Sequence, residues 1–284
     1  MATTPFKSIT RLAGTRVLVI GGTSGIGFSV AAAALEHGAS VIVASSKATN
    51  VESAVSRLKE TYPPEYAAKV AGLVCDLGNQ TTLDENVVRL LTEATSPSLF
   101  FPSGENKGGE KVLLDHIAYT AGDTLAPSTF SLENTTISTV TSSLTVRYFA
   151  PIILAKHLSS YMNLTSSSSL TLTSGTNATK PSKGWSVAAS IGSAIEGLAR
   201  GLAVDLAPLR VNTVSPGAVH TELFDRLLGG RKEVLEGALK RMANDTLVEK
   251  VARPDEVAEA YVYIMKDGFV DGVILRSDGG RLLK

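Results

Sequence analysis

The stretch "TRVLVIGGTSGIG", residues 15–27, decides the fold. Its first half is a compact β-branched run that predicts a buried strand, and its second half is a glycine-rich turn. The alanine-rich spacing of residues 29–39 predicts a helix after that turn, and residues 40–46 return to a strand pattern. Together these segments predict one βαβ unit.

The same alternation continues along the chain. Further helices are predicted at residues 51–62, 83–94, 139–162, 186–207 and 253–266, and further strands at 67–77, 111–122, 169–175, 210–216 and 273–280. Strands that alternate with helices are typical of a parallel sheet covered on both faces. We therefore expect an α/β fold, a doubly wound parallel sheet of the Rossmann type, as a single domain over residues 1–284.

Two segments do not fit the alternation. Residues 96–110 are rich in Pro, Gly and Ser, which indicates a surface insertion, or simply a loose loop. Residues 220–251 contain a pair of polar-faced helices, which we expect to form a lid over a cleft beyond the strand ends.

Composition excludes several classes of partner. Lys plus Arg equal Asp plus Glu at 27 each, so the chain has no excess charge to bind nucleic acid or an anionic membrane. The single Cys75 has no partner for a disulfide or a Cys/His metal site, which favours a reducing compartment and predicts no metal. No run approaches 18 apolar residues and no signal peptide is evident, so we expect a soluble, cytoplasmic protein.

The glycine-rich turn carries the first functional prediction. Glycines at this position permit a tight turn and close approach of a pyrophosphate, while amides at the helix start face its negative charge. The alternative is a turn with a structural role only. The expected dinucleotide contacts from this loop are Gly21, Thr23, Ser24, Gly25, Ile26 and Gly27.

These motifs resemble those of the short-chain dehydrogenase/reductase family over nearly the whole chain. Gly21, Gly25 and Gly27 match the family's TGxxxGxG loop, and "CDL" (75–77), "YTAG" (119–122), "RVNTVSPGAVHTEL" (210–223) and the final "DGG" match later family motifs. The resemblance implies a nicotinamide dinucleotide cofactor. It assigns further cofactor contacts to Asp76, Leu77, Ala121, Gly122, Pro216, Gly217, Val219 and Thr221.

The end of the second strand indicates which dinucleotide is used. An Asp there would bind the ribose 2′-hydroxyl and repel a 2′-phosphate, whereas this chain has Ser45, Ser46 and Lys47. Hydroxyl donors followed by an ammonium favour NADP(H). Against this, Lys47 is also consistent with a solvated surface charge, and the basic residue that the family often carries inside the glycine loop is replaced by Ser24.

The family's catalytic pair is missing. The resemblance implies a Ser that orients the substrate, a Tyr that transfers a proton and a Lys that lowers the pKa of that Tyr. Ser174 matches the first, but Ala188 and Gly192 stand at the other two positions. Since ordinary alcohol oxidation needs a general base of suitable pKa to take the hydroxyl proton, we do not expect that reaction by the family route.

Three nearby residues are candidates to replace the lost chemistry. Arg147, in an apolar helix, is suited to hold developing negative charge, although an ion pair with Glu196 is an equal alternative. Trp185, the only tryptophan, would form an aromatic wall or simply pack. Tyr119 would place a hydroxyl near the nicotinamide, or serve packing alone.

Residues 181–185, "PSKGW", and Arg147 are also similar to a divergent branch of the family. That branch includes fungal natural-product enzymes that reduce an iminium with NADPH and promote an intramolecular cycloaddition. Its cyclising members have an acidic residue three positions before the Trp, where this chain has Ser182. His220 on the loop at 216–221 is a further candidate proton donor or an exposed side chain, and Lys183 is expected to be solvated.

The resulting hypothesis is an atypical NADP(H)-dependent reductase of a small apolar molecule, with an iminium, an activated double bond or a carbonyl as the reacting group. A non-catalytic dinucleotide-binding scaffold or sensor, and a cofactor-bound cyclase, remain as alternatives. The small residues of the helix at 187–207 permit close helix approach, and in the resembled family such helices build dimers and tetramers. We therefore expect a homodimer or homotetramer.

Overall fold

The structure is a computed structural model that describes residues 7–100, 109–122, 132–227 and 232–284. Its centre is a seven-stranded parallel sheet in the order β3-β2-β1-β4-β5-β6-β7. The predicted α/β class and doubly wound parallel sheet are confirmed. The strands are β1 (Arg16–Ile20), β2 (Ser40–Ser45), β3 (Val70–Val74), β4 (His116–Tyr119), β5 (Ser169–Thr173), β6 (Arg210–Pro216) and β7 (Ile274–Ser277).

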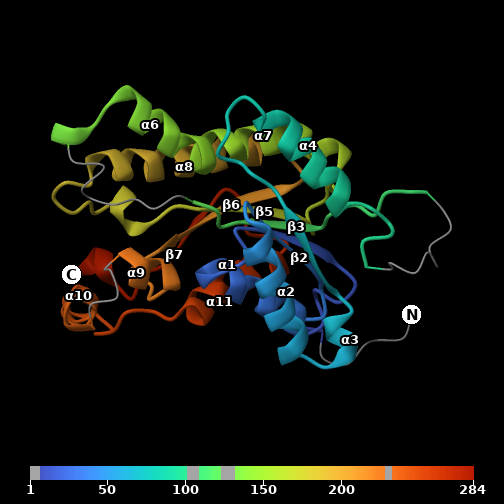
Figure 1. Ribbon diagram of the computed structural model, residues 1–284, viewed down its shortest axis with the longest axis horizontal. Helices are drawn as coiled ribbons and strands as arrows, with labels where there is room; N and C mark the ends of the chain where they lie inside the picture. The colour runs from blue at the N-terminus through green and yellow to red at the C-terminus, as the bar shows by residue number, and fades with distance from the viewer. Residues whose placement is uncertain (1–6, 101–108, 123–131, 228–231) are drawn as a thin grey trace.

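Helices cover both faces of this sheet (Figure 1). One layer contains α1 (Gly25–Glu36), α2 (Ala48–Thr61) and α11 (Pro254–Lys266). The opposite layer contains α4 (Leu83–Ala94), α6 (Ile137–Leu144), α7 (Ala150–His157) and α8 (Ser186–Asp205). The chain also forms several short helical turns: α3 (Pro64–Ala67), η1 (Leu132–Asn134), η3 (Leu158–Ser160), η4 (Thr176–Ala178) and η5 (Arg281–Leu283).

The period-2 alternation of β1 divides the core between the two layers. Leu18 and Ile20 pack in the cluster formed with α4, α7 and α8, whereas Val17 and Val19 pack in the cluster formed with α1, α2 and α11. All five residues of β1 are buried, as expected for a central parallel strand that is covered on both faces. This double burial explains why the strand is a continuous apolar run rather than an alternating one.

The strand order reverses at β1, which pairs with β2 on one side and β4 on the other. Crevices at the carboxyl ends of strands beside such a reversal are where doubly wound proteins bind ligands. The glycine-rich loop leaves the end of β1 and enters α1 at this point. The fold therefore places the predicted phosphate loop at the expected crevice.

Some predicted boundaries were wrong. The helix expected over 139–162 is interrupted by a π-helical turn, η2 (Thr145–Phe149), between α6 and α7. The strand expected over 111–122 is only the four-residue β4, because Leu114 forms an isolated bridge with Met162 before the strand begins. The last strand ends at Ser277, since Gly279 and Gly280 adopt positive φ angles that turn the chain.

The helical pair expected at 220–251 is present as α9 (Glu222–Leu227) and α10 (Lys232–Asn244), beside the C-terminal turn in Figure 1. Of the predicted insertion at 96–110, residues 101–108 lie outside the described residues. The described part before them is a turn through residues 97–100.

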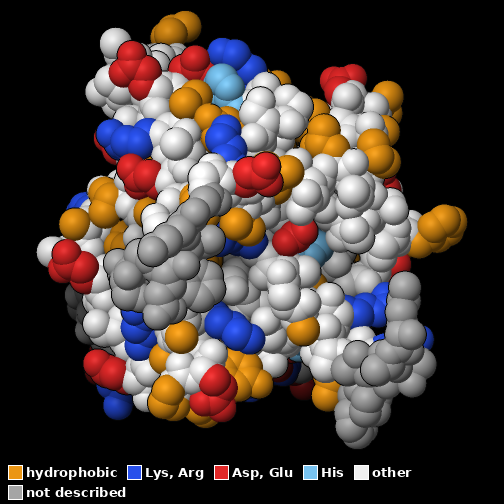
Figure 2. Space-filling view, turned by 90° about the vertical axis from the view of Figure 1, so that its right-hand side faces the viewer, with side chains coloured by type: hydrophobic (Ala, Val, Ile, Leu, Met, Phe, Trp, Pro, Cys, Tyr) orange, Lys and Arg blue, Asp and Glu red, His pale blue; other side chains and the backbone are white. Residues whose placement is uncertain are grey.

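Two stretches, residues 137–160 and 186–205, are long and apolar enough by composition to cross a membrane. Both belong to the helical layer over the sheet, and Leu154 and Ile191 from them are buried in its core. In the apolar window of each stretch 28% and 22% of the residues are buried, so core packing accounts for part of their apolar composition. On the face shown in Figure 2, acidic and basic side chains are interspersed, in keeping with the balanced charge of the sequence. Within the described ranges, no group of three or more His, Cys, Asp or Glu side chains is placed to hold a metal.

Candidate active site

A cleft of about 380 Å³ lies at the carboxyl ends of β1 to β4. Most of the residues predicted to contact a dinucleotide line it: Gly21, Thr23, Ser24, Gly25, Ile26, Gly27, Ser45, Ser46, Asp76, Leu77, Ala121, Gly122 and Thr221. Eight further lining residues were not predicted to contact the cofactor, namely Ile20, Ala44, Asn50, Cys75, Gly78, Thr120, Val146 and Leu223. The structure thus brings predicted contacts from five separate segments, those after β1, β2, β3, β4 and β6, to one cavity.

The glycine loop has no room for side chains where it approaches its neighbours. Gly21 has φ +87°, and a Cβ there would lie 2.6 Å from the backbone nitrogen of Ala121. A Cβ on Gly27 would lie 2.2 Å from the carbonyl oxygen of Gly21. These close approaches let α1 start directly at the loop, so that its first amides, which have no acceptor within the helix, lie beside the cleft. The cradle fits the pyrophosphate of a dinucleotide.

The far end of the cleft is lined by Ser45, Ser46 and Asn50. Lys47 is the N-cap of α2 and is exposed, and it is not among the residues that line the cavity. Asn50 lies in the first turn of α2, and its place soon after the strand is the sequence signal that would have identified it. Hydroxyl and amide groups at the start of a helix form a polar end to the cleft.

The wall after β3 combines a turn and a buried thiol. The Asp76 carboxylate accepts a hydrogen bond from the amide of Gly78 at 2.8 Å, which fixes the turn. Cys75 lines the cleft beside it, and burial raises the pKa of its thiol to about 11. The thiol is therefore protonated near neutral pH and acts as an apolar part of the wall.

The segment after β6 closes the cleft from the other side. Thr221 lines it and would contact a Cβ built on Gly25 at 3.1 Å. The Glu222 carboxylate accepts a hydrogen bond from the amide of Gly25 at 3.0 Å. The sequence analysis did not single out Glu222. It places a negative charge at the start of α1, beside the proposed pyrophosphate cradle.

Three residues of this segment that were predicted to contact the cofactor do not line the cleft. They are Pro216, the last residue of β6, with Gly217 and Val219. The amide of Gly217 bonds to the Ser277 carbonyl at 3.0 Å, and Val219 forms a parallel bridge with Ala252. Their described contacts set the path of the loop that carries Thr221.

A second, smaller cavity of about 130 Å³ adjoins β5 and α8. Arg147, Ser174 and Trp185, three of the four predicted catalytic residues, line it together. Ala188 and Gly192, at the positions where the resembled family has Tyr and Lys, line the same cavity. The structure thus places three of the candidate catalytic residues and the positions of the lost pair at one site.

Arg147 lies in the π-helical turn η2 and connects the two cavities. Its guanidinium packs against Gly122, where an added Cβ would lie only 2.4 Å from the guanidinium carbon. Gly122 and Val146 line the large cleft, whereas Arg147 lines the small one. Single π turns occur often at functional sites because they displace one side chain from the regular helical path.

Tyr119 is packed inside the fold, which is one of the two roles predicted for it. Its side chain is 3% exposed, and its hydroxyl donates a hydrogen bond to the carbonyl of Val146 within the π turn. Its own carbonyl accepts a hydrogen bond from Thr173 at 2.7 Å. Tyr119 lines neither cavity. This geometry favours a positioning role, in which Tyr119 supports the turn that carries Arg147, over direct contact with the nicotinamide.

Ser174 makes a contact that the sequence did not reveal. Its hydroxyl donates to the Glu196 carboxylate at 2.9 Å, and its amide bonds to the Val214 carbonyl at 2.9 Å. Glu196 comes from α8, eight residues after Ala188, where it is an acidic residue in a helix of small residues. With its proton directed at Glu196, the Ser174 oxygen offers the cavity a hydrogen-bond acceptor.

The remaining candidates lie outside both cavities. His220 pairs through Nε2 with the Asp225 carboxylate at 2.7 Å, and its side chain is 41% exposed. Lys183 is exposed, as expected. Neither residue lines the cleft or the cavity beside α8.

The chain matches a family model. The SDR-like Rossmann domain covers residues 8–284. Among curated proteins, the chain is 41% identical over 273 residues to the short-chain dehydrogenase/reductase malC of Malbranchea aurantiaca, a match that covers 96% of both chains. It is 40% identical to the short-chain dehydrogenase/reductase fsr5 of Gibberella fujikuroi, with 98% of both chains covered.

Solved structures give the same result. The structure of the MalC reductase/Diels-Alderase from Malbranchea aurantiaca matches with a TM-score of 0.87 and 40% identity over 98% of this chain and all of that one. A short-chain dehydrogenase from Burkholderia cenocepacia in complex with NADP has a TM-score of 0.75 and 23% identity, and covers 96% of this chain and 99% of its own. The second likeness concerns the fold.

Proposed function

Because the chain belongs to the short-chain dehydrogenase/reductase family, whose Rossmann fold binds a nicotinamide dinucleotide, we propose that it is an NADP(H)-dependent reductase with a non-standard active site. Its substrate is a small apolar molecule with an iminium or an activated double bond, and with a carbonyl as the less favoured reacting group. The fungal relatives support an oxidoreductase of secondary metabolism.

The contact between Ser174 and Glu196 carries this proposal. In the family mechanism the serine hydroxyl and a tyrosine would both give hydrogen bonds to a carbonyl oxygen. Here the Ser174 proton is directed at Glu196, and Ala188 stands at the tyrosine position. An acceptor backed by a carboxylate stabilises a cationic or N–H-bearing group better than a carbonyl oxygen. A protonated C=N group needs no further proton during its reduction, so the missing acid costs such a substrate little.

The other cavity residues have complementary roles in this proposal. Trp185 forms an aromatic wall that packs on an apolar or flat substrate and on a cationic group. The Arg147 guanidinium, held between the two cavities, binds an oxygen or a developing negative charge elsewhere on the substrate. Arg147 thus binds a negatively polarised group of the substrate and Ser174 a positively polarised one, and the two contacts together orient the substrate.

The cofactor assignment rests on the cleft at the glycine loop. The cradle formed by Gly21, Gly25 and Gly27 would hold the pyrophosphate, and Ser45, Ser46 and Asn50 would surround the 2′-position of the adenosine ribose. These side chains are uncharged, so they do not repel a 2′-phosphate, which favours NADP(H) over NAD(H). When bound, NADPH supplies the hydride.

A cyclase is the second candidate, because a relative 40% identical over nearly the whole chain is described as a reductase/Diels-Alderase. In this role the same cavity would align two parts of one substrate against Trp185. Ser182, where cyclising enzymes of this type have an acid, is the feature that weighs against it. A scaffold that binds the dinucleotide without turnover is the reading left if neither reaction occurs.

We further propose that α9 and α10 form a lid over the substrate, and that the enzyme is a cytoplasmic homodimer or homotetramer. Support for assembly comes from the small residues of α8 and from its Val204, a residue that is 78% exposed. Light scattering after size-exclusion chromatography measures the assembly directly, and a monomer would contradict this part of the proposal.

The test starts from purified protein titrated separately with NADPH and NADH, followed by nicotinamide fluorescence. We expect tighter binding of NADPH. Turnover is then measured by absorbance loss of NADPH with cyclic imines, beginning with 3,4-dihydroisoquinoline, and with enones. Glu196→Gln keeps the shape of the side chain but removes its charge, and it is expected to lower imine turnover by about tenfold.

Lys183→Ala is the matched control, because Lys183 is exposed in the segment that carries Trp185. It should turn over imines as the unchanged protein does. Tight NADPH binding without turnover of any imine or enone would refute the reductase and leave the cyclase or the scaffold.

A further inference from the structure

Arg281 is a buried cation that joins three distant segments. Its side chain is 11% exposed, and its guanidinium donates to the Asp245 carboxylate at 2.9 Å and to the Thr176 hydroxyl at 2.9 Å. A longer contact of 3.5 Å reaches the Ser182 hydroxyl. None of these partners is closer than 36 residues in the sequence. Such a fork of contacts requires the planar guanidinium of arginine.

Two of the partners lie at the two ends of one wall of the smaller cavity beside β5 and α8, which is the substrate cavity in the proposed function. Thr176 begins η4, and Asn177 and Ala178 within that turn line the cavity. Ser182 precedes Trp185, whose amide bonds to the Ser182 carbonyl at 3.1 Å. The wall of residues 176–185 is therefore held by Arg281 near its start and just before its aromatic end.

The backbone of Arg281 holds the same wall. Its carbonyl accepts a hydrogen bond from the Lys180 ammonium at 3.1 Å, in the middle of the wall segment. The side chain and the carbonyl of one residue thus contact residues 176, 180 and 182. Movement of Arg281 would release the wall at all three points.

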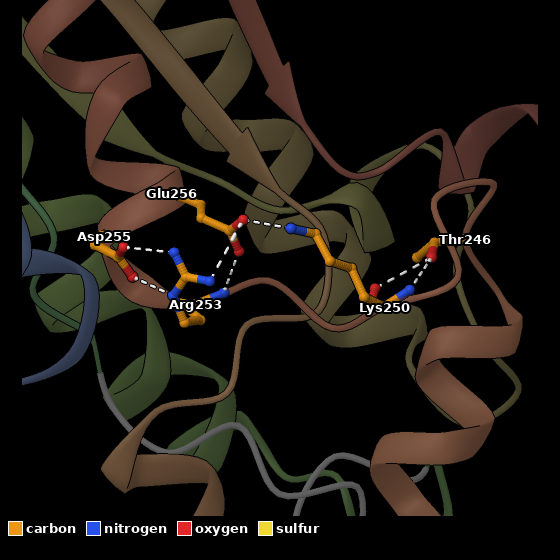
Figure 3. Close-up of polar contacts among 5 residues, drawn as sticks. All are labelled: Thr246, Lys250, Arg253, Asp255 and Glu256. Atoms are coloured by element: carbon orange, nitrogen blue, oxygen red, sulfur yellow. Dashed lines mark hydrogen bonds and ion pairs between the residues drawn. The ribbon is translucent and has the colours of Figure 1, made fainter.

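The third partner, Asp245, directly follows the end of α10, and this end is firmly anchored. The amide of Leu247 bonds to the Gly279 carbonyl at 2.8 Å, which joins the turn after α10 to the turn before Arg281. Figure 3 shows the continuation: Thr246 bonds to the backbone of Lys250, and the Lys250 ammonium contacts Glu256 at the start of α11. Arg253 pairs with Asp255 on the same helix.

Arg281 therefore joins the anchored end of α10, at Asp245, to the wall of the substrate cavity formed by residues 176–185. We propose that Arg281 is a positioning residue for that cavity: it holds the wall at residues 176–185 against the end of α10 and so fixes where Trp185 stands. The role of the cavity in reduction rests on the proposed function, but the position of Trp185 does not. Because Trp185 is the only tryptophan, its fluorescence reports this position directly.

Arg281→Lys is the main test, since lysine keeps the charge and loses the fork of contacts. We expect Stern–Volmer quenching of Trp185 by acrylamide to rise at least twofold, because the released wall exposes the indole. With 3,4-dihydroisoquinoline as the probe, KM should rise about tenfold while kcat changes less, because the wall orients the substrate and does not transfer a proton.

Arg276→Lys is the matched control, because Arg276 is an exposed arginine in the adjacent strand β7. It should leave both quenching and KM unchanged. Asp245→Asn removes the charge on the supporting side and should change both readouts in the same direction as Arg281→Lys. It also provides the measurement if Arg281→Lys does not fold. The double variant should show less than the sum of the two effects, because both changes break one contact.

The outcomes separate this inference from the proposed function. Quenching that rises in Arg281→Lys and Asp245→Asn, in a protein that turns over no imine or enone, supports the inference and refutes the reductase. A lower melting temperature with quenching and KM equal to those of Arg276→Lys would show a purely structural arginine and overturn the inference.

Discussion

Gly122→Ala tests whether the position of Arg147 matters. The new Cβ would lie 2.4 to 2.6 Å from three guanidinium atoms of Arg147, whereas ordinary contact begins at 3.4 Å. The guanidinium must therefore retreat by about 1 Å, a displacement that can cost about 100-fold in rate at a site where orientation matters. Because the guanidinium ends a flexible side chain, the fold should yield at small cost, about 1 kcal/mol or less.

We expect Gly122→Ala to lower the melting temperature by no more than about 3 °C and imine turnover by about 100-fold. Differential scanning fluorimetry and NADPH-dependent absorbance assays measure the two effects. Gly268→Ala is the control, because Gly268 is exposed and a Cβ there would make only an ordinary contact, 3.6 Å from the Ser166 carbonyl oxygen. It should leave turnover unchanged.

A double-mutant cycle with Arg147→Ala decides the cause. If the methyl group acts through Arg147, Gly122→Ala should cost little further activity once the guanidinium is gone. An undiminished loss in the Arg147→Ala background, or an equal weakening of NADPH binding by the methyl group, would refute the reasoning and show direct interference with the cofactor.

Three further predictions concern the cofactor loop and the core. Glu222→Gln removes a negative charge beside the pyrophosphate cradle. NADPH should then bind about five times more tightly in fluorescence titrations, since like charges a few ångströms apart cost about 1 kcal/mol. Weaker binding would instead show that the carboxylate is needed to hold the segment after β6 against the glycine loop. Gly27→Ala places a Cβ 2.2 Å from the backbone oxygen of Gly21, which cannot move aside, so NADPH binding should fall by at least about 100-fold, and near-normal affinity would contradict the cradle. Burial, with the nearby Arg210 charge, lowers the pKa of His116 to about 3. As pH falls, the histidine is therefore protonated in the unfolded chain before it is protonated in the folded protein. The free energy of unfolding should decrease between about pH 6.5 and pH 3, by up to about 1.4 kcal/mol per pH unit. Urea unfolding at pH 7, 6 and 5 should show a shallower slope for His116→Asn, and equal slopes would exclude this cause.

Local sequence patterns were sufficient to predict that the strands, most of the helices and the glycine-rich loop are present and in which order. The run at 15–27 is apolar where it is buried on both faces, and its glycines stand where neighbouring backbone leaves no space for a Cβ. Both properties follow from neighbours close in the chain or from the regular pairing of parallel strands. The absence of a tyrosine at 188 and a lysine at 192 is likewise a property of the sequence.

The π turn at 145–149 was not predictable from the helical pattern. Its residues continue the apolar spacing of α6 and α7, so the sequence gives no sign that the helix changes there. The described contact at the turn is the hydrogen bond that the Tyr119 hydroxyl donates to the Val146 carbonyl. That contact joins residues 27 positions apart. The position of the Lys47 side chain was also not predictable from the local pattern. Lys47 follows its strand as expected, but it is the N-cap of α2 and does not line the cleft.

The sequence by itself therefore determined the fold class, the place of the dinucleotide cradle and the loss of the family's proton donor, because each depends on residue type and local spacing. Only the tertiary structure decided which side chains meet beside the positions of the missing pair. The contacts of Ser174 with Glu196, of Arg147 with Gly122 and of Arg281 with Thr176 join side chains that are 22, 25 and 105 residues apart. Such contacts form when the packing of helices on the sheet fixes their distance and direction, and no periodicity in the chain records them.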